Sequence, residues 1–306
     1  MHGFAALRRL ALPCLALAAA LAAPAWAAAP ATVTVGTLKA ERHGDHGRPV
    51  ILIPGLEGGP WVWERTIAAL EKDHVVYAVT LAGFDGMPAP KDDTHLMDQA
   101  SRSLLDLIDQ QKIDHPVLVG HSLGGTLALR FAGEHGQRIA GVVAVDGLPI
   151  LPGMDRMTPE QRAAAAGGIR AQMGKATPEE FQASTLAYMK SVGMIDPTQA
   201  EHYAALNARS DAKATAAYMA DDMAADYRPG LKQAQMPILE ISPYYAPDFS
   251  KPPMQFTEQQ KTDYYKRLIG DAPNLKVVSI APSRHFVMLD QPERFQQVLD
   301  DYLHAL

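Results

Sequence analysis

The sequence predicts an α/β protein with a mostly parallel central sheet flanked by helices. Short apolar stretches such as residues 49–53 and 117–119 alternate along the chain with segments of helical periodicity. These stretches are apolar without interruption, which is typical of strands buried on both faces of a parallel sheet. With 306 residues, 47% of them hydrophobic and 20% charged, the chain is long enough to form one large core.

The first 27 residues are expected to form a secretory signal peptide. Arg8 and Arg9 precede an apolar run over residues 10–23, and Ala25-Trp26-Ala27 supplies a small-residue cleavage site. The run of about 14 residues is shorter than a membrane-spanning helix requires. It also contains Cys14, the one cysteine of the sequence. We therefore expect a periplasmic or secreted protein whose mature chain has no cysteine and no stable membrane insertion.

The charge balance argues against nucleic acid or an anionic membrane as a partner. Loss of Arg8 and Arg9 takes the 28 Lys and Arg residues to 26, against 34 Asp and Glu, for a formal net charge of −8. His43 and His46 share a polar turn, but no third ligand lies near them in the sequence, so no metal site is predicted.

The predicted sheet is built from residues 28–147 and 231–306. Ligands of such sheets bind at the carboxyl ends of the parallel strands. A first edge strand over residues 32–37 precedes the polar turn over residues 41–48. The other expected strands cover residues 49–53, 75–80, 116–119, 139–145, 237–241 and 275–280, and the expected helices cover residues 61–71, 95–111, 126–135, 257–269 and 292–303.

Residues 148–230 are expected to form a helical insertion in which the strand pattern stops. Thr158, Thr177 and Asp196 each precede a proline, as at helix starts. The expected helices cover residues 159–173, 178–191, 197–208 and 212–224. The insertion is rich in methionine, which fills irregular gaps and lines adaptable apolar pockets. We expect Met157 and Met223 to line a substrate pocket, with core packing as the alternative role.

The segment Gly120-His121-Ser122-Leu123-Gly124 fits the G-x-S-x-G pattern of a nucleophile elbow. An elbow places the serine on a strained turn between a strand and a helix, so that its hydroxyl stands clear of the sheet. Glycine at the two flanking positions removes side chains that would collide. The helix start offers free N–H groups to a developing oxyanion.

This elbow, the upstream Ile53-Pro54-Gly55-Leu56 loop and the late Arg284-His285-Phe286 segment together resemble the α/β-hydrolase superfamily. The resemblance covers nearly all of the mature chain. It implies an α/β-hydrolase fold in which residues 148–230 form a helical cap. It also implies that Ser122 is the nucleophile and His285 the general base, and that the N–H groups of Leu56 and Leu123 form the oxyanion hole. Many relatives have His-Gly where this chain has Pro54-Gly55.

The resemblance leaves two candidates for the acid of the triad. Asp146 ends the apolar stretch over residues 142–145, a position from which a subset of the superfamily takes its acid. Asp248 lies seven residues beyond Ile241, in a proline-rich loop, after the strand that carries the acid in much of the superfamily. We favour Asp146 because a strand end holds a carboxylate more rigidly than a loop does.

The sequence therefore predicts a serine hydrolase that cleaves a carboxylic ester or lactone with an apolar portion through an acyl-enzyme. No metal and no organic cofactor is implied. His121, inside the elbow, is a candidate for contact with the small-molecule substrate. Other reactions of the same triad, carbon–carbon hydrolysis or cofactor-free haloperoxidation, remain alternatives, as does a non-catalytic ligand-binding receptor on the same scaffold.

Overall fold

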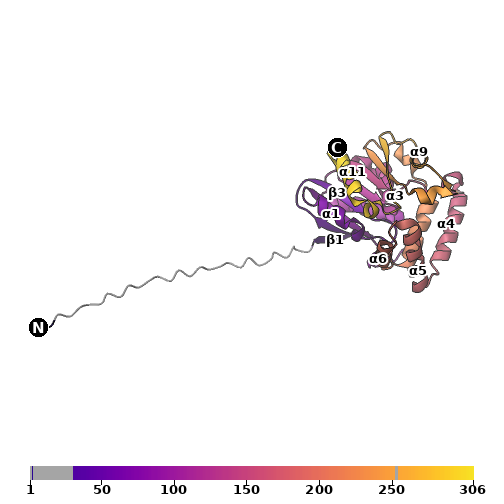
Figure 1. Ribbon diagram of the computed structural model, residues 1–306, viewed down its shortest axis with the longest axis horizontal. Coiled ribbons are helices and arrows are strands. Elements are labelled where there is room, and N and C mark those ends of the chain that lie inside the picture. The colour runs from indigo at the N-terminus through magenta and orange to yellow at the C-terminus, as the bar shows by residue number, and fades with distance from the viewer. Residues whose placement is uncertain (1, 3–29, 252–253) are drawn as a thin grey trace.

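One eight-stranded sheet runs through the protein. The computed structural model describes residue 2 and residues 30–251 and 254–306 (Figure 1). The strand order is β1-β2-β4-β3-β5-β6-β7-β10. The pairs β1–β2 and β2–β4 are antiparallel and every other pair is parallel, which confirms the predicted fold class. The strands are β1 (Ala31–Val35), β2 (Leu38–His43), β3 (Arg48–Ile53), β4 (His74–Leu81), β5 (Val117–His121), β6 (Gly141–Val145), β7 (Ile238–Pro243) and β10 (Leu275–Ile280).

Both faces of the sheet are covered by helices. In β3, Val50 and Leu52 join one apolar cluster, whereas Ile51 and Ile53 join the other. The first cluster contains residues of η1 (Pro60–Trp63), α1 (Glu64–Leu70), α10 (Val287–Asp290) and α11 (Pro292–His304). The second contains residues of α2 (Leu96–Gln110), α3 (Leu123–His135) and α9 (Glu258–Ile269). This division explains why the central strands are apolar without alternation.

Between β6 and β7, where every residue is described, the chain forms helices and loops without a strand. Thr158 and Thr177 each form a capping box, and Asp196 accepts hydrogen bonds from the N–H groups of Thr198 and Gln199, as their positions before proline predict. In Figure 1, α4 and α5 lie on the side of the molecule away from β1, and α6 lies between α5 and β1 in this view. The elements are η3 (Met154–Arg156), α4 (Pro159–Met173), α5 (Pro178–Tyr188), the π-helical turn η4 (Met189–Gly193), α6 (Pro197–Asn207), α7 (Ala212–Ala224) and α8 (Arg228–Leu231).

Two segments differ from the sequence expectations. The predicted edge strand over residues 32–37 is present as β1, but it ends at Val35, because Gly36 turns the chain at φ +55° and β2 pairs back on β1. The polar turn therefore begins after His43. The proline-rich stretch after β7 forms a short 3-10 helix, η5 (Ala246–Phe249), and a small hairpin of β8 (Ser250–Lys251) and β9 (Met254–Gln255). A further 3-10 turn, η2 (Gly136–Arg138), follows α3.

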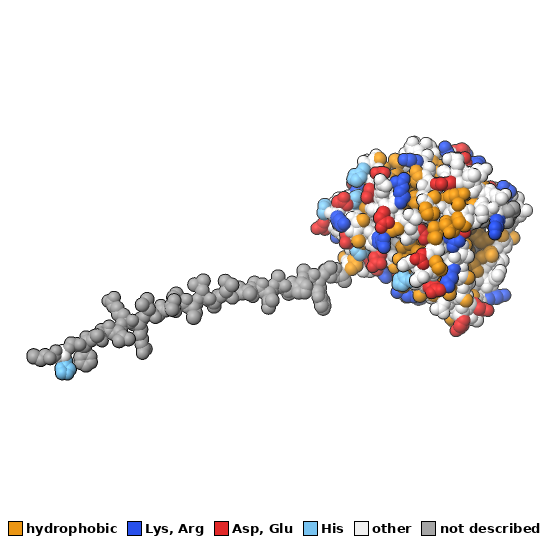
Figure 2. Space-filling view, viewed as in Figure 1, with side chains coloured by type: hydrophobic (Ala, Val, Ile, Leu, Met, Phe, Trp, Pro, Cys, Tyr) orange, Lys and Arg blue, Asp and Glu red, His pale blue; other side chains and the backbone are white. Residues whose placement is uncertain are grey.

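The predicted signal peptide falls on residues 1–27, which lie outside the described residues except for His2. Among the described helices, none combines the length and the hydropathy that a membrane span requires. Figure 2 shows acidic and basic side chains mixed over the viewed face, with apolar areas between them.

Candidate active site

Ser122 lies on a sharp turn between β5 and α3. Its backbone is in the left-handed region at φ 53° and ψ −123°, and its N–H donates to the carbonyl of Val145 at 2.9 Å. A Cβ at position 120 would lie 2.2 Å from the carbonyl oxygen of Gly124, and one at position 124 would lie 2.3 Å from that of Ile53. Both distances are shorter than backbone atoms allow, which confirms the reason for glycine on either side of the serine.

Asp146 is paired with His285 across the top of the sheet. It follows β6, and its own N–H donates to the carbonyl of Ile241 at 2.9 Å, which ties it to β7. Asp146 Oδ2 lies 2.5 Å from His285 Nδ1, and Tyr265 donates its hydroxyl to the other carboxylate oxygen. Burial raises the pKa of Asp146, but His285, Lys261 and Tyr265 outweigh that effect and hold the pKa below its usual range. The aspartate is therefore ionised and oriented toward the imidazole.

Asp248, the other candidate acid, is engaged elsewhere. Arg284 donates to both of its carboxylate oxygens, with Nε at 2.8 Å and Nη2 at 2.7 Å. The same guanidinium donates to the carbonyls of Lys190 and Met194 at 2.9 and 3.0 Å. Asp248 thus orients an arginine that joins the His285 loop to η4, and the structure does not place it beside the imidazole.

The π-helical turn η4 lies against the His285 loop. The N–H of His285 donates to the carbonyl of Val192 at 3.3 Å, and that of Phe286 to the carbonyl of Gly193 at 3.0 Å. Tyr188, at the end of α5, presents its ring edge-on to His285 at 6.0 Å between centroids. The helical segment between β6 and β7 therefore helps to position the histidine.

Two backbone N–H groups near Ser122 are free. Leu56 follows β3, in a loop that approaches the serine so closely that a Cβ on Gly55 would lie 2.9 Å from Ser122 Cβ. Leu123 is the first residue of α3. Among residues 30–251 and 254–306, neither N–H donates to a protein acceptor. Both are therefore available to an oxygen atom beside Ser122, as an oxyanion hole requires.

Two cavities meet at Ser122 and His285, and both are also lined by Leu56, Tyr188 and Met219. The first cavity, of about 230 Å³, extends to Glu57, Thr185 and Asn207. The second cavity, of about 350 Å³, extends to Leu148, Leu151 and Asp222. A molecule whose two parts join at a carbonyl could occupy both cavities with that carbonyl at the serine.

Of the three residues that the sequence predicts in the substrate pocket, His121 lines a cavity, whereas Met157 and Met223 do not. His121 lines the first cavity, but it is buried, and its ring packs against Phe286 at 4.6 Å and donates to the carbonyl of His285 at 3.0 Å. Burial lowers its pKa well below the ordinary value, so it is neutral. Met157 and Met223 line neither cavity. Met157 lies before α4 with 37% of its surface exposed, and Met223 lies one turn of α7 beyond Met219.

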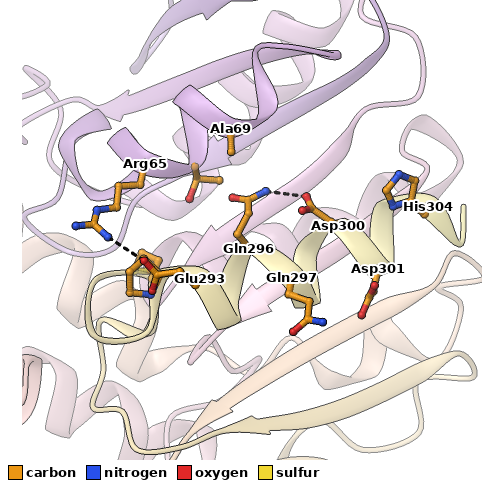
Figure 3. Close-up of a pocket in the computed structure, with 11 residues that line it drawn as sticks. Arg65, Ala69, Glu293, Gln296, Gln297, Asp300, Asp301 and His304 are labelled. Carbon is orange, nitrogen blue, oxygen red and sulfur yellow. Dashed lines mark hydrogen bonds and ion pairs between the residues drawn. The ribbon is translucent and has the colours of Figure 1, made fainter.

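A larger cavity, of about 520 Å³, lies between α1 and α11 (Figure 3). It is lined mainly by charged and amide side chains, several of them already paired. Arg65 lies 3.5 Å from Glu293, and Gln296 donates to Asp300 at 2.7 Å. Since this groove contains no pairing of a nucleophile with a base, the candidate active site is the one at Ser122.

Comparison with known proteins agrees with this geometry. The sequence profile of the Alpha/beta hydrolase family matches residues 50–298. The rice protein named Probable esterase PIR7A (Oryza sativa subsp. indica) is 38% identical over 92 residues, which are 29% of this chain and 35% of that protein. The chain thus spans about a third of the length of the curated relatives it matches.

Two solved structures resemble almost the whole described chain. The enol-lactonase from Burkholderia xenovorans LB400 is 20% identical with a TM-score of 0.69, and covers 90% of this chain and 100% of its own. The bromoperoxidase from Bacillus anthracis is 19% identical with a TM-score of 0.71 and the same coverage. At these identities the likeness shows the fold. Because the family profile matches most of the sequence and the sheet has the same architecture, the chain belongs to the α/β-hydrolase family.

Proposed function

We propose that this protein is a serine hydrolase that cleaves a carboxylic ester or lactone of a small molecule with an apolar portion. The observation that carries the proposal is the pairing of His285 with the ionised, largely buried Asp146 beside a serine on a strained elbow. The two free N–H groups next to that serine are the second requirement of acyl transfer.

The reaction follows from this arrangement. His285 takes the proton of Ser122 as the hydroxyl oxygen attacks the substrate carbonyl, and Asp146 stabilises the imidazolium that results. Leu56 and Leu123 donate their N–H groups to the oxyanion. The carbon–oxygen bond to the alcohol then breaks, and the alcohol leaves with the proton from His285. Water, deprotonated by His285, then attacks the acyl-enzyme. The bond between the acyl carbon and the Ser122 oxygen breaks, the acid leaves, and His285 returns the proton to Ser122.

Ester chemistry is favoured over the other reactions of this triad by the two cavities, which suit an acyl part and an alcohol part on either side of one carbonyl. The rice relative is named a probable esterase, and one of the structural neighbours is named an enol-lactonase. Because another structural neighbour is named a bromoperoxidase, haloperoxidation is the second candidate function.

The proposal includes the domain roles and the location expected from sequence. Residues 148–230 act as a cap over the sheet formed by residues 28–147 and 231–306. Residues 1–27 direct export, so that hydrolysis takes place in the periplasm or outside the cell.

A panel of carboxylic esters and lactones tests the proposal on the wild type and two variants. Ser122→Ala is expected to reduce kcat by about 10³-fold or more, because the nucleophile is lost. Ser250→Ala is the matched control, since Ser250 is exposed and, among the described residues, its hydroxyl forms a hydrogen bond only with the carbonyl of Pro247. Turnover by Ser122→Ala that matches the control would refute the proposal.

A further inference from the structure

Glu57 is a carboxylate at the wall of the first cavity, one residue after the free N–H of Leu56. Its backbone is in the left-handed region at φ 63°. Thr185, on α5, donates its hydroxyl to Glu57 Oε2 at 3.0 Å, and Ser210, before α7, donates to the Glu57 carbonyl at 3.0 Å. Groups from two separate segments of residues 148–230 therefore set the position of this residue. Among the described residues, none donates a hydrogen bond to Glu57 Oε1.

No cationic side chain compensates this carboxylate. Among the described residues, no lysine or arginine lines either cavity. His121 is neutral, and His285 is paired with Asp146. Burial raises the pKa of Glu57 to about 7, although the bond from Thr185 acts in the opposite direction. A carboxylate that is partly withdrawn from water without a counter-charge carries an energetic cost, and a cationic ligand would reduce that cost.

A second acceptor lies on the same cavity. Asn207, at the end of α6, is 2% exposed, and its Oδ1 has no hydrogen-bond partner among the described residues. Its Nδ2 donates weakly to the sulfur of Met189 at 3.4 Å. Much of the remaining wall is apolar, with Leu56, Met173, Met219 and Phe286. The first cavity is thus an apolar chamber with a surplus of acceptors, which calls for a ligand that brings N–H donors.

We propose that Glu57 is a specificity-determining residue and that the first cavity binds a part of the substrate that carries a protonated amine. The amine donates to Glu57, and Asn207 supplies the second acceptor. The inference rests on the proposed ester hydrolysis at Ser122, and it names the substrate class of that site as esters of amino alcohols or of amino acids.

The test compares isosteric substrates that differ only in charge. On the alcohol side the pair is 2-(dimethylamino)ethyl acetate and 3-methylbutyl acetate. On the acyl side it is ethyl 4-(dimethylamino)butanoate and ethyl 5-methylhexanoate. Hydrolysis is followed by titration of the released acid at pH 7.5. Using both pairs makes the result independent of which part of the substrate enters the first cavity.

In at least one pair the wild type is expected to prefer the amine by about tenfold to a hundredfold in kcat/KM, the range for a buried hydrogen bond between charged groups. Glu57→Gln keeps the shape and an acceptor for Thr185, and is expected to abolish that preference while retaining turnover of the neutral ester. Asp222→Asn is the matched control, since it removes a buried carboxylate from the second cavity. It is expected to keep the preference.

The outcomes separate the two proposals. Equal rates on amine and neutral esters in the wild type, or a preference that survives Glu57→Gln, would overturn the inference and leave ester hydrolysis intact. A preference lost in Asp222→Asn but kept in Glu57→Gln would also overturn it. If the wild type hydrolyses none of the four esters, or Ser122→Ala hydrolyses them equally well, the proposed function itself is wrong and the inference falls with it.

Discussion

Each carboxylate oxygen of Asp146 accepts its own hydrogen bond, one with His285 and one from Tyr265. Tyr265 is buried on α9, where burial raises its pKa well above the ordinary value, so it stays protonated and can only donate to the carboxylate. The aspartate cannot rotate without breaking one of these bonds. At the scale of single residues, the aspartate that orients the imidazole is therefore itself held by Tyr265, a residue 119 positions away from it in sequence.

Replacing each candidate acid with asparagine tests this arrangement. Asp146→Asn is expected to reduce kcat on a neutral ester by about 10³- to 10⁴-fold with little change in KM, because the imidazole loses the group that selects its tautomer and stabilises its charge.

The matched variant is Asp248→Asn, which weakens the bond to Arg284 and is expected to cost less than about tenfold in kcat. Both variants are measured in the same assay. If Asp248→Asn shows the large reduction in kcat and Asp146→Asn does not, the acid has been assigned to the wrong residue.

Helices α4 to α7 contribute part of the wall of the first cavity, and the rotation of each helix about its axis decides which methionines reach the cavity. Met219 on α7 lines both cavities, whereas Met157 lies outside them and is partly exposed. The sequence predicted a methionine-lined pocket but named Met157 and Met223, since composition shows that a segment is rich in methionine without showing which side faces the serine. At the scale of elements, we therefore propose that substrate range depends on the inward face of α7.

Met219→Ala tests this dependence on a series of linear acyl esters from acetate to octanoate. Removing a side chain shared by both cavities enlarges them, so kcat/KM for octanoate relative to acetate is expected to rise by about threefold or more. Met157→Ala is expected to leave the octanoate-to-acetate ratio unchanged. A change of similar size in that control would show that the two cavities do not determine the preference for acyl chain length.

At the scale of the whole molecule, local sequence patterns predicted most of the scaffold. The uninterrupted apolar residues 50–53 indicated a strand buried on both faces, and the glycines around Ser122 indicated the elbow. The hairpin of β1 and β2 was not predicted. Lys39 and Glu41 give β2 a polar sequence that resembles the polar turn after it. A partly exposed antiparallel strand has little to distinguish it from a loop when one sequence is read alone.

The contacts that complete the site could not be predicted, because each joins residues distant in sequence. Tyr265 reaches Asp146 across 119 positions, Arg284 reaches Asp248 across 36, and Thr185 reaches Glu57 across 128. Sequence could show that Ser122, Asp146 and His285 end strands or follow them, and parallel strands bring such ends together. Which carboxylate meets the imidazole depends on side-chain directions that only the folded chain defines.

The most direct test of the account is the covalent labelling of the protein by a fluorophosphonate, read by intact mass and by mapping the modified peptide. An activated serine in a working triad is expected to take up one label per chain, on Ser122, and Ser122→Ala is expected to take up none. A wild-type protein that stays unlabelled, or that carries its label on another residue, would contradict the assignment of Ser122, His285 and Asp146 as a hydrolytic triad.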